Sequence, residues 1–322
     1  AHCVAGARDP SMQLFWVAGR MMFQKIRRLF RSPRISLALA GGGCKAFFGL
    51  GVVSVLKNHG YTFYQAAGTS AGSAMLLGGL AGESDHIVDY FCEITSRNPA
   101  NFHISRILGG RRPFPHERMY RKTIATFMDT EKIQSLREEI LINALKLPGD
   151  LNAAARVKLV ARIVRAFRQE ERLEAQGIYR PHMRQVARLA GLRETLFSNA
   201  DLASPEMVEN IILASSSVPP MVSFQKIGND YYLDGGITNN LPAVFFKPCD
   251  LVIAIYYMEQ TRHFYELTGH HAEQPVLYCR PHGRLPITTW DYANPEGVRK
   301  TYKMGLQAGE FLLEKLERAG FT

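Results

Sequence analysis

The order of strand-like and helix-like segments near the start of the chain is the feature that most constrains its fold. The apolar run ISLALAGGG at 35–43 ends in three glycines, as a buried parallel strand does, and residues 45–58 follow with a helical pattern. The segment 61–68 is expected to form a second strand, and 70–81 a second helix. Two strand–helix units in succession require a parallel sheet with right-handed crossovers, so we predict an α/β domain.

The middle of the chain, residues 84–205, differs because its pattern is mostly helical and carries much of the charge. We interpret it as a helical insertion into a three-layer α/β/α domain that spans 35–322. One helix of this insertion is expected to present an apolar stripe made of Val157, Val160, Val164 and Phe167. The favoured interpretation is a cap helix that packs on the domain, and the alternative is a helix that faces lipid or nucleic acid.

Strand-like segments return after this middle region. A helix is expected at 205–213 and another from about 295 to 318. Between these helices lie three strand-like runs, DYYLDGG, DLVIAIYYM and PVLYCR. The sequence contains no internal repeat and no low-complexity linker, which favours one domain over two.

The composition restricts the partners of the chain. Its 322 residues carry a formal net charge of +10, which favours an anionic partner such as a membrane surface, a nucleic acid or a phosphorylated substrate. The basic residues of the helical middle are not interleaved with aromatic ones, so nucleic acid is not expected. The five cysteines show no CxxC spacing, which argues against a disulfide framework or a zinc site and fits a cytoplasmic protein. No apolar run is long enough to span a bilayer, so membrane association is expected to be peripheral.

A basic amphipathic leader, residues 1–34, precedes the domain, and residues 1–11 are set aside as a processing remnant. A secretory signal would place its basic residues before its apolar run, whereas here LFWVAG precedes RMMFQKIRRLFR. On a helix, Met22, Ile26 and Leu29 would share one face, with the basic side chains largely off it. This pattern fits a membrane-surface helix or, equally well, a leader that packs on the domain.

The glycine run GGGCKA at 41–46 follows the first strand. It fits a loose dinucleotide pattern, but that pattern needs an acidic residue about 20 positions further on, and no Asp or Glu occurs between Asp9 and Glu83. A glycine-rich turn before a helix can instead present bare N–H groups to a developing negative charge, such as the oxyanion of an acyl intermediate. The candidate oxyanion loop therefore comprises Gly41, Gly42 and Gly43.

The pentapeptide GTSAG at 68–72 directly follows the second expected strand. In a GxSxG elbow the serine takes a strained backbone conformation, and Gly68 and Gly72 leave room for the tight crossing from strand to helix. The hydroxyl of Ser70 would then point outward at the carboxyl edge of the sheet as a candidate nucleophile. The alternative is a turn that merely requires small residues.

A serine nucleophile needs a base, and the stretch YLDGGITNNLP offers one. Asp234 ends a strand-like run, and Gly235 and Gly236 leave its carboxylate unobstructed. The alternative is a simple turn. Because α/β-hydrolases use a histidine that follows the serine and the acid, the rival bases are His263, His270, His271 and His282. None of these histidines has a recognisable strand-end setting, and GHHAEQ is expected to form an exposed loop, so we prefer Asp234.

In that order, GGGCKA, GTSAG and DGG resemble the motifs of the patatin-like phospholipases, and ASSSVPPMVSF resembles the stretch ahead of the base in that family. The resemblance covers roughly residues 35–256, apart from much of the helical middle. The chain differs from the usual family pattern in having Ala46 where a glycine is common.

The resemblance implies a hydrolase that cleaves acyl esters of lipids without a metal or cofactor. Ser70 would attack, Asp234 would accept its proton, and the amides of Gly42 and Gly43 would hold the oxyanion. Lys45 of the same glycine motif would either contact an anionic headgroup or lie in solvent. Phospholipid or lysophospholipid is the expected substrate, met at an anionic membrane surface. The alternatives are a carboxylesterase or acyl-thioesterase acting on soluble acyl donors, and a non-catalytic membrane-binding module of the same fold.

Overall fold

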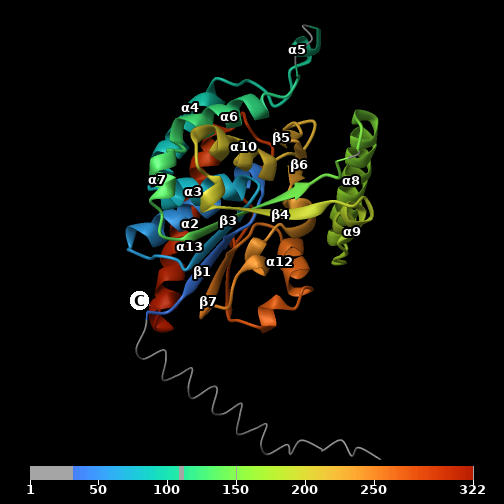
Figure 1. The fold of residues 1–322 in the computed structure, drawn as a ribbon. Coiled ribbons are helices and arrows are strands. Elements are labelled where there is room, and N and C mark those ends of the chain that lie inside the picture. Colours follow the sequence, from blue (N-terminus) through green and yellow to red (C-terminus); the bar gives the residue numbers. More distant parts are fainter. Residues whose placement is uncertain (1–31, 109–111, 150, 322) are drawn as a thin grey trace, which may run out of the picture. The chain divides into compact units, whose positions relative to one another are not determined.

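The computed structural model describes residues 32–108, 112–149 and 151–321, and it divides the chain into one unit of residues 1–34 and another of residues 35–322 (Figure 1). The leader expected at 1–34 therefore lies almost wholly outside the described residues. The fold described below is that of the second unit.

An eight-stranded sheet forms the centre of this unit. Its strands are β1 (Ile35–Leu39), β2 (Gln65–Thr69), β3 (Glu139–Lys146), β4 (Arg193–Ser198), β5 (Gln225–Ile227), β6 (Asp230–Asp234), β7 (Leu251–Ile255) and β8 (Val276–Cys279). They follow the spatial order β5-β6-β3-β2-β1-β7-β8, with β4 paired to β3 outside this path. The five strands from β3 to β8 along this order are parallel, whereas β4 and β6 are antiparallel to β3, and β5 is antiparallel to β6.

Helices and short 3₁₀ turns connect the strands. The helices are α2 (Phe47–Asn58), α3 (Ala71–Leu80), α4 (Ser84–Ser96), α5 (Ile104–Leu108), α6 (His116–Phe127), α7 (Thr130–Gln134), α8 (Ala153–Glu174), α9 (His182–Leu189), α10 (Pro205–Ser215), α11 (Gly236–Asn239), α12 (Glu259–Glu266) and α13 (Pro295–Arg318). The 3₁₀ turns are η1 (Gly43–Ala46), η2 (Asn199–Asp201), η3 (Pro242–Phe245) and η4 (His270–Ala272).

Both faces of the sheet are covered, because successive side chains of a strand point to opposite faces. From β1, Leu37 and Leu39 pack into the larger core with α2, α3, α4, α6, α10 and α13. Ala38 of the same strand faces the other way, into a smaller core with η3 and α12. A third cluster, around Leu145 and Leu233, packs against α8 and α9. The three-layer α/β/α architecture expected from the sequence is thus confirmed (Figure 1).

The extent of the helical insertion expected at 84–205 was wrong, because two strands of the sheet lie inside it. The run EILINALK forms β3, whose six central residues are buried and which pairs in parallel with β2. A short apolar run between charged segments fits a buried strand as well as a helix, and its periodicity does not separate the two. The inserted helical part is therefore the hairpin of α8 and α9 between β3 and β4.

In the described part of the chain, none of the helices combines the length and the apolarity that crossing a bilayer requires.

Candidate functional site

Ser70 occupies a one-residue elbow between β2 and α3. Its φ of 56° and ψ of −137° make it the one residue other than glycine with a positive φ among the described residues. Such a conformation costs on the order of 1–3 kcal/mol and persists only where surrounding contacts impose it. Here the Ser70 amide donates to the Ser215 hydroxyl over 2.8 Å, and the Ser70 carbonyl accepts from both the amide and the hydroxyl of Ser73 at 2.9 and 2.6 Å.

The two glycines that flank Ser70 are required by close backbone contacts. A Cβ atom on Gly68 would lie 2.5 Å from the Cα of Ser73, and one on Gly72 would lie 2.5 Å from the carbonyl oxygen of Ala40. Both neighbours are main-chain atoms, which cannot move aside as a flexible side chain can. The elbow therefore exists in this sequence only because both positions lack a side chain.

The glycine loop after β1 lies directly against the elbow. A Cβ on Gly41 would lie 2.7 Å from the Cβ of Ser70. The Gly41 amide, however, donates to Oδ1 of Asn240 over 3.1 Å, while Nδ2 of Asn240 donates back to the Gly41 carbonyl over 3.2 Å. No hydrogen bond within the described residues engages the amides of Gly42 and Gly43. Of the three candidate oxyanion glycines, only these two present free N–H groups.

The structure also explains two further residues of the glycine motif, Ala46 and Cys44. Ala46 has helical backbone angles of −67° and −12°, so a residue other than glycine fits there without strain. The Cys44 thiol is buried and donates to the Asp291 carbonyl over 3.4 Å, and burial raises its pKa. Cys44 is therefore a packed thiol rather than a reactive one.

Asp234 lies at the end of β6 with only 6% of its surface exposed. Its Oδ1 accepts a hydrogen bond from the Gly236 amide over 2.7 Å, and the Ser70 hydroxyl also interacts with its carboxylate. Burial raises the pKa of Asp234 to about 6, and these two interactions oppose that rise because they stabilise the charged form. A side chain on Gly235 would overlap the main chain of Asn143, so this glycine too is required by packing.

The register of β3 explains why Ser70 and Asp234 meet. Residues 141–143 of β3 pair with β2 and β4 at once, and residues 144–146 pair with β4 and β6. Since a strand has only two edges, β2 and β6 must share the edge opposite β4. Thr69 pairs with Asn143 and Asp234 pairs with Ala144, so the carboxyl ends of β2 and β6 meet end to end.

Three side chains that hold this junction together were missed by the sequence analysis. Asn143 is fully buried, and its Nδ2 donates to the carbonyls of Gly235 and Asn239 at 3.2 and 3.1 Å. Ser215 bridges the Ser70 amide to the Asn143 carbonyl, and Asn240 ties the glycine loop to the DGG segment. A signal existed for Asn143, since it is the one polar residue inside an otherwise apolar strand core.

A cleft with a volume of about 1260 Å³ opens beside these residues. Its floor includes Ser70, Asp234 and the three loop glycines. Its walls are largely apolar and come from α8 (Val160, Ile163, Val164 and Phe167), from residues 218–221 and 285–287, and from Ile237 and Phe264. The stripe expected on α8 is thus corrected, because Val157 is 66% exposed and Leu159, Ile163 and Ala166 are the residues buried in the core.

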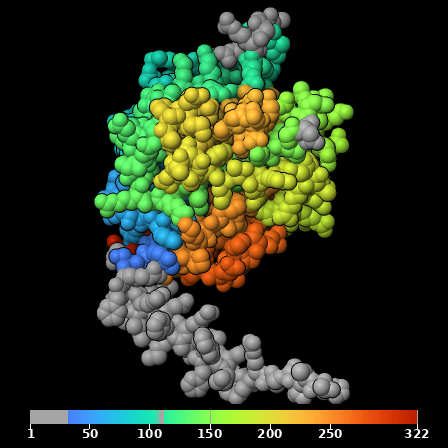
Figure 2. All heavy atoms as spheres, viewed as in Figure 1, coloured from blue at the N-terminus to red at the C-terminus, as the bar shows by residue number. Residues whose placement is uncertain are grey.

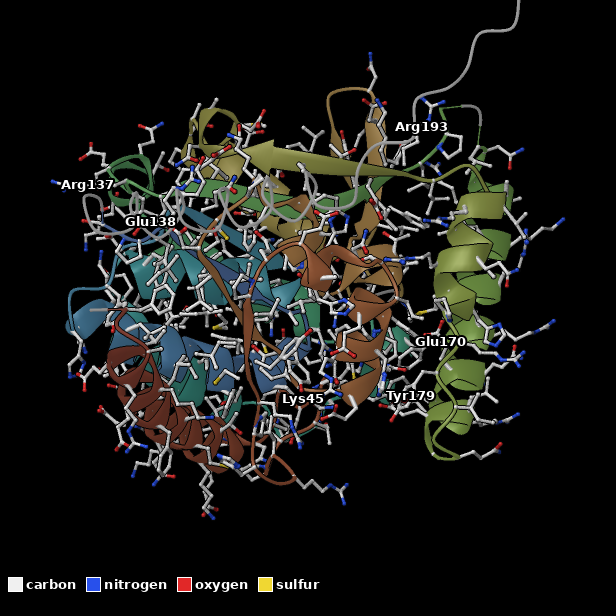
Figure 3. The ribbon with its side chains drawn as sticks, turned by 90° about the horizontal axis from the view of Figure 1, so that it is seen from below. Lys45, Arg137, Glu138, Glu170, Tyr179 and Arg193 are labelled. Carbon is white, nitrogen blue, oxygen red and sulfur yellow. The ribbon has the colours of Figure 1, made fainter. Side chains whose placement is uncertain are left out.

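Lys45 lines the same cleft rather than lying free in solvent. Burial lowers the pKa of its ammonium group, while Glu171 and Glu174 of α8 raise it. Figure 3 labels Lys45 at the lower part of the domain body and Glu170 of α8 on the hairpin to its right. The ammonium group of Lys45 therefore lies at the wall of the cleft, close to the glycine loop.

The rival histidines do not join this arrangement. No histidine is among the described residues that line the cleft. His263 stacks on Tyr179 with ring centroids 3.9 Å apart, and His282 contacts the ring of Phe311. His270 and His271 lie in η4. Across 32–108, 112–149 and 151–321, no cluster of three or more His, Cys, Asp or Glu side chains is placed to hold a metal ion.

One class of α/β proteins is defined by three features of its site. These are a serine on a strained strand-to-helix elbow, a glycine loop with free amides and a buried carboxylate. A sequence model of one family in this class, the patatin-like phospholipases, matches residues 37–246, and the chain belongs to that family.

Solved structures of low sequence identity resemble the chain. They include VipD from Legionella pneumophila (9% identity, TM-score 0.37, covering 87% of this chain and 67% of that one) and human GIVD cytosolic phospholipase A2 (10%, 0.42, 89% and 63%). The type III effector protein ExoU is similar at 15% identity, with a TM-score of 0.33 and coverages of 88% and 53%. The chain thus spans between about half and two thirds of these structures. A comparison with curated protein sequences found no significant match.

Proposed function

We propose that this protein hydrolyses acyl ester bonds of lipids, with Ser70 as the nucleophile and Asp234 as its general base. The observation that carries the proposal is the pairing of the Ser70 hydroxyl, held on a strained elbow, with the buried Asp234 carboxylate where β2 and β6 meet end to end. A nucleophile within hydrogen-bonding reach of a base is the minimum arrangement for covalent acyl transfer. Membership of the patatin-like phospholipase family supports the same reaction class.

In this proposal the Ser70 oxygen attacks the ester carbonyl carbon while Asp234 accepts the hydroxyl proton. With a pKa of about 6, Asp234 is ionised near pH 7 and is still a stronger base than an exposed carboxylate. The negative oxygen of the tetrahedral intermediate would be bound by the Gly42 and Gly43 amides, assisted by the N-terminal ends of η1 and α3. Asp234 then returns the proton to the departing alcohol, and a water molecule activated by Asp234 hydrolyses the acyl-enzyme.

The shape and lining of the cleft support a lipid substrate. Sites for small ligands usually measure about 300–1,000 Å³. At about 1260 Å³, with apolar walls from α8 and residues 285–287, this cleft has room for a long acyl chain. Phospholipid and lysophospholipid are therefore the proposed substrates. A carboxylesterase or acyl-thioesterase on soluble acyl donors remains the alternative, and a non-catalytic membrane-binding module is the second.

The setting follows from the substrate, since a lipid hydrolase must meet a membrane surface. The net charge of +10 favours an anionic one. The buried cysteines Cys44, Cys92 and Cys279 are free thiols, which fits a reducing compartment. We place the enzyme at the cytoplasmic face of a membrane, as a peripheral protein without metal or cofactor.

Replacement of the nucleophile tests the proposal directly. Ser70→Ala should abolish both phospholipid hydrolysis and covalent labelling by an organophosphonate, because no other hydroxyl occupies the elbow. The surface variant Ser135→Ala is the matched control and should keep both. A label that persists in Ser70→Ala, or that maps to another serine, would disprove the assignment. Rates on acyl chains of increasing length separate the lipid hydrolase from a short-chain esterase, which would favour the short chains.

A further inference from the structure

The side chains of helix α8 lie on three faces about a third of a turn apart, and each face has a different environment. One face, with Leu159, Ile163 and Ala166, is buried in the domain, and Glu170 on it accepts a 2.6 Å hydrogen bond from the Met183 amide of α9. The second face lines the cleft with Val160, Val164 and Phe167. The third face is turned to solvent and carries Lys158, Arg162, Arg165 and Arg172, which we call the basic stripe.

Within the part of the chain that the structure describes, the four cations of the basic stripe have no side-chain partner. No ion pair, hydrogen bond or ring contact among the described residues involves their side chains. Other cations of the same hairpin do have partners. Arg156 lies over the ring of Tyr231 at 3.9 Å, and Arg184 donates to the Thr238 carbonyl over 2.8 Å. The stripe thus collects four cations that lack a counter-charge among the described residues on one solvent-facing side of α8.

Unpaired like charges at this spacing repel one another. Lys158 and Arg162 are four residues apart, and Arg162 and Arg165 are three apart, so each pair lies side by side on the helix. Gln169 continues the stripe between Arg165 and Arg172. Like-charge neighbours destabilise a helix, and an anionic surface laid against the stripe would remove that repulsion.

The neighbouring side chains favour a lipid surface over a nucleic acid. The edge between the basic stripe and the cleft face carries Val157, Ala161 and Arg168, all exposed, so the border is aliphatic and basic. The exposed faces of the hairpin offer no aromatic platform on which bases could stack. Figure 2 shows the α8–α9 hairpin at the surface of the unit, and in Figure 3 nitrogen-tipped side chains project from its outer side, opposite the labelled Glu170.

We propose that the basic stripe of α8 docks this protein on an anionic lipid bilayer. Docking would place α8, which forms one wall of the cleft, at the lipid surface. This inference rests on the proposed function and extends it, because binding to a bilayer explains how a lipid substrate reaches the cleft. The docking step itself does not depend on the chemistry at Ser70.

The test compares two full-length variants that lose the same charge. The stripe variant carries Lys158→Gln, Arg162→Gln, Arg165→Gln and Arg172→Gln, none of which lines the cleft. The control variant carries Lys122→Gln, Arg137→Gln, Lys303→Gln and Lys315→Gln, all exposed on other elements. Co-sedimentation with vesicles of phosphatidylcholine and phosphatidylserine in a 7:3 ratio, and with pure phosphatidylcholine vesicles, gives the affinities. Both variants keep residues 1–34, so any contribution of the leader is common to them.

The stripe variant should bind the anionic vesicles roughly 100-fold more weakly at low salt, since each basic residue near such a surface contributes severalfold to the affinity. The control variant should bind like the wild type, and neither should bind neutral vesicles well. Both should hydrolyse a soluble short-chain ester at the wild-type rate, so a wild type inactive on that ester would disprove the proposed function but not the docking. Equal losses in both variants would show an effect of net charge alone and overturn the proposal. Tighter binding of a DNA duplex than of vesicles, lost in the stripe variant, would also overturn it.

Discussion

At the scale of single residues, two opposing effects act on the Asp234 carboxyl group. Burial disfavours its charged form, while the Ser70 hydroxyl and the Gly236 amide stabilise that form. The result is a carboxyl with a pKa of about 6, against an ordinary value of 3.8. A carboxyl with such a pKa is suited to act as a base near neutral pH.

This pKa predicts the acid limb of the pH–rate profile. Protonated Asp234 cannot accept the Ser70 proton, so kcat/KM on a soluble ester should fall about tenfold per pH unit below pH about 6 and level off above it. Initial rates between pH 4.5 and 8.5 measure the profile. A midpoint near pH 4, with no decline at pH 5, would contradict the role of Asp234.

The same shift makes the charged carboxylate a cost to stability. Between pH 3.8 and about 6 the folded state holds a proton that the unfolded state has lost, so wild-type stability falls as the pH rises through this window. Asp234→Asn carries no charge and avoids that loss. It should be more stable than the wild type by roughly 3 kcal/mol at pH 7.5 and by only about 1 kcal/mol at pH 4.5. Urea unfolding at the two pH values checks this, and a difference independent of pH would show that the native carboxyl is not shifted.

At the scale of elements, the candidate site is the meeting point of two strand ends and one loop. The short helix α11 follows Asp234 and ends beside Asn240, whose amide pairs with both the N–H and the carbonyl of Gly41. Asn240 also donates to the Thr261 hydroxyl over 3.1 Å. One side chain therefore sets the position of the glycine loop relative to the DGG segment.

Asn240 should accordingly act as a positioning residue. In Asn240→Ala the Gly41 peptide loses both partners, and the free amides of Gly42 and Gly43 shift relative to Ser70. We expect kcat to fall by about 10²-fold while KM changes little, as for a lost oxyanion donor. Asn240→Asp, which keeps the acceptor for the Gly41 amide, should lose less. A rise in KM with unchanged kcat would show that Asn240 acts in binding instead.

At the scale of the whole molecule, the folded unit extends well beyond the stretch that matches the family. That match ends at residue 246, yet β7 pairs with β1 along Ile35–Leu39, and α13 packs along α2. The α2–α13 contact is close enough that a Cβ on Gly305 would overlap the Phe48 carbonyl. The C-terminal helix is therefore part of the core that supports the elbow.

A methyl group at this helix crossing should destabilise the protein. Gly305→Ala forces α13 away from α2, and overpacking of this kind costs about 1–3 kcal/mol, which corresponds to a Tm lower by roughly 3–10 °C. Gly149→Ala is the control, because a Cβ there meets no atom within 4 Å. Thermal unfolding followed by circular dichroism measures both. Equal melting temperatures in the two variants would show that the crossing tolerates a wider spacing.

The sequence by itself determined the local motifs of this protein. These are three glycines after a strand, a serine between Gly68 and Gly72, and an aspartate before two glycines. Each motif requires its residue types for short-range reasons. The family and the α/β class follow from these motifs and their order. Tertiary structure alone decided which of the candidates meet. The Gly41 amide donates a hydrogen bond to Asn240, a residue 199 positions away in the sequence. Strand β3 lies inside the region expected to be helical, and helix α8 forms a wall of the cleft. These features depend on strand register and on contacts between distant segments, which local patterns of hydrophobicity do not encode.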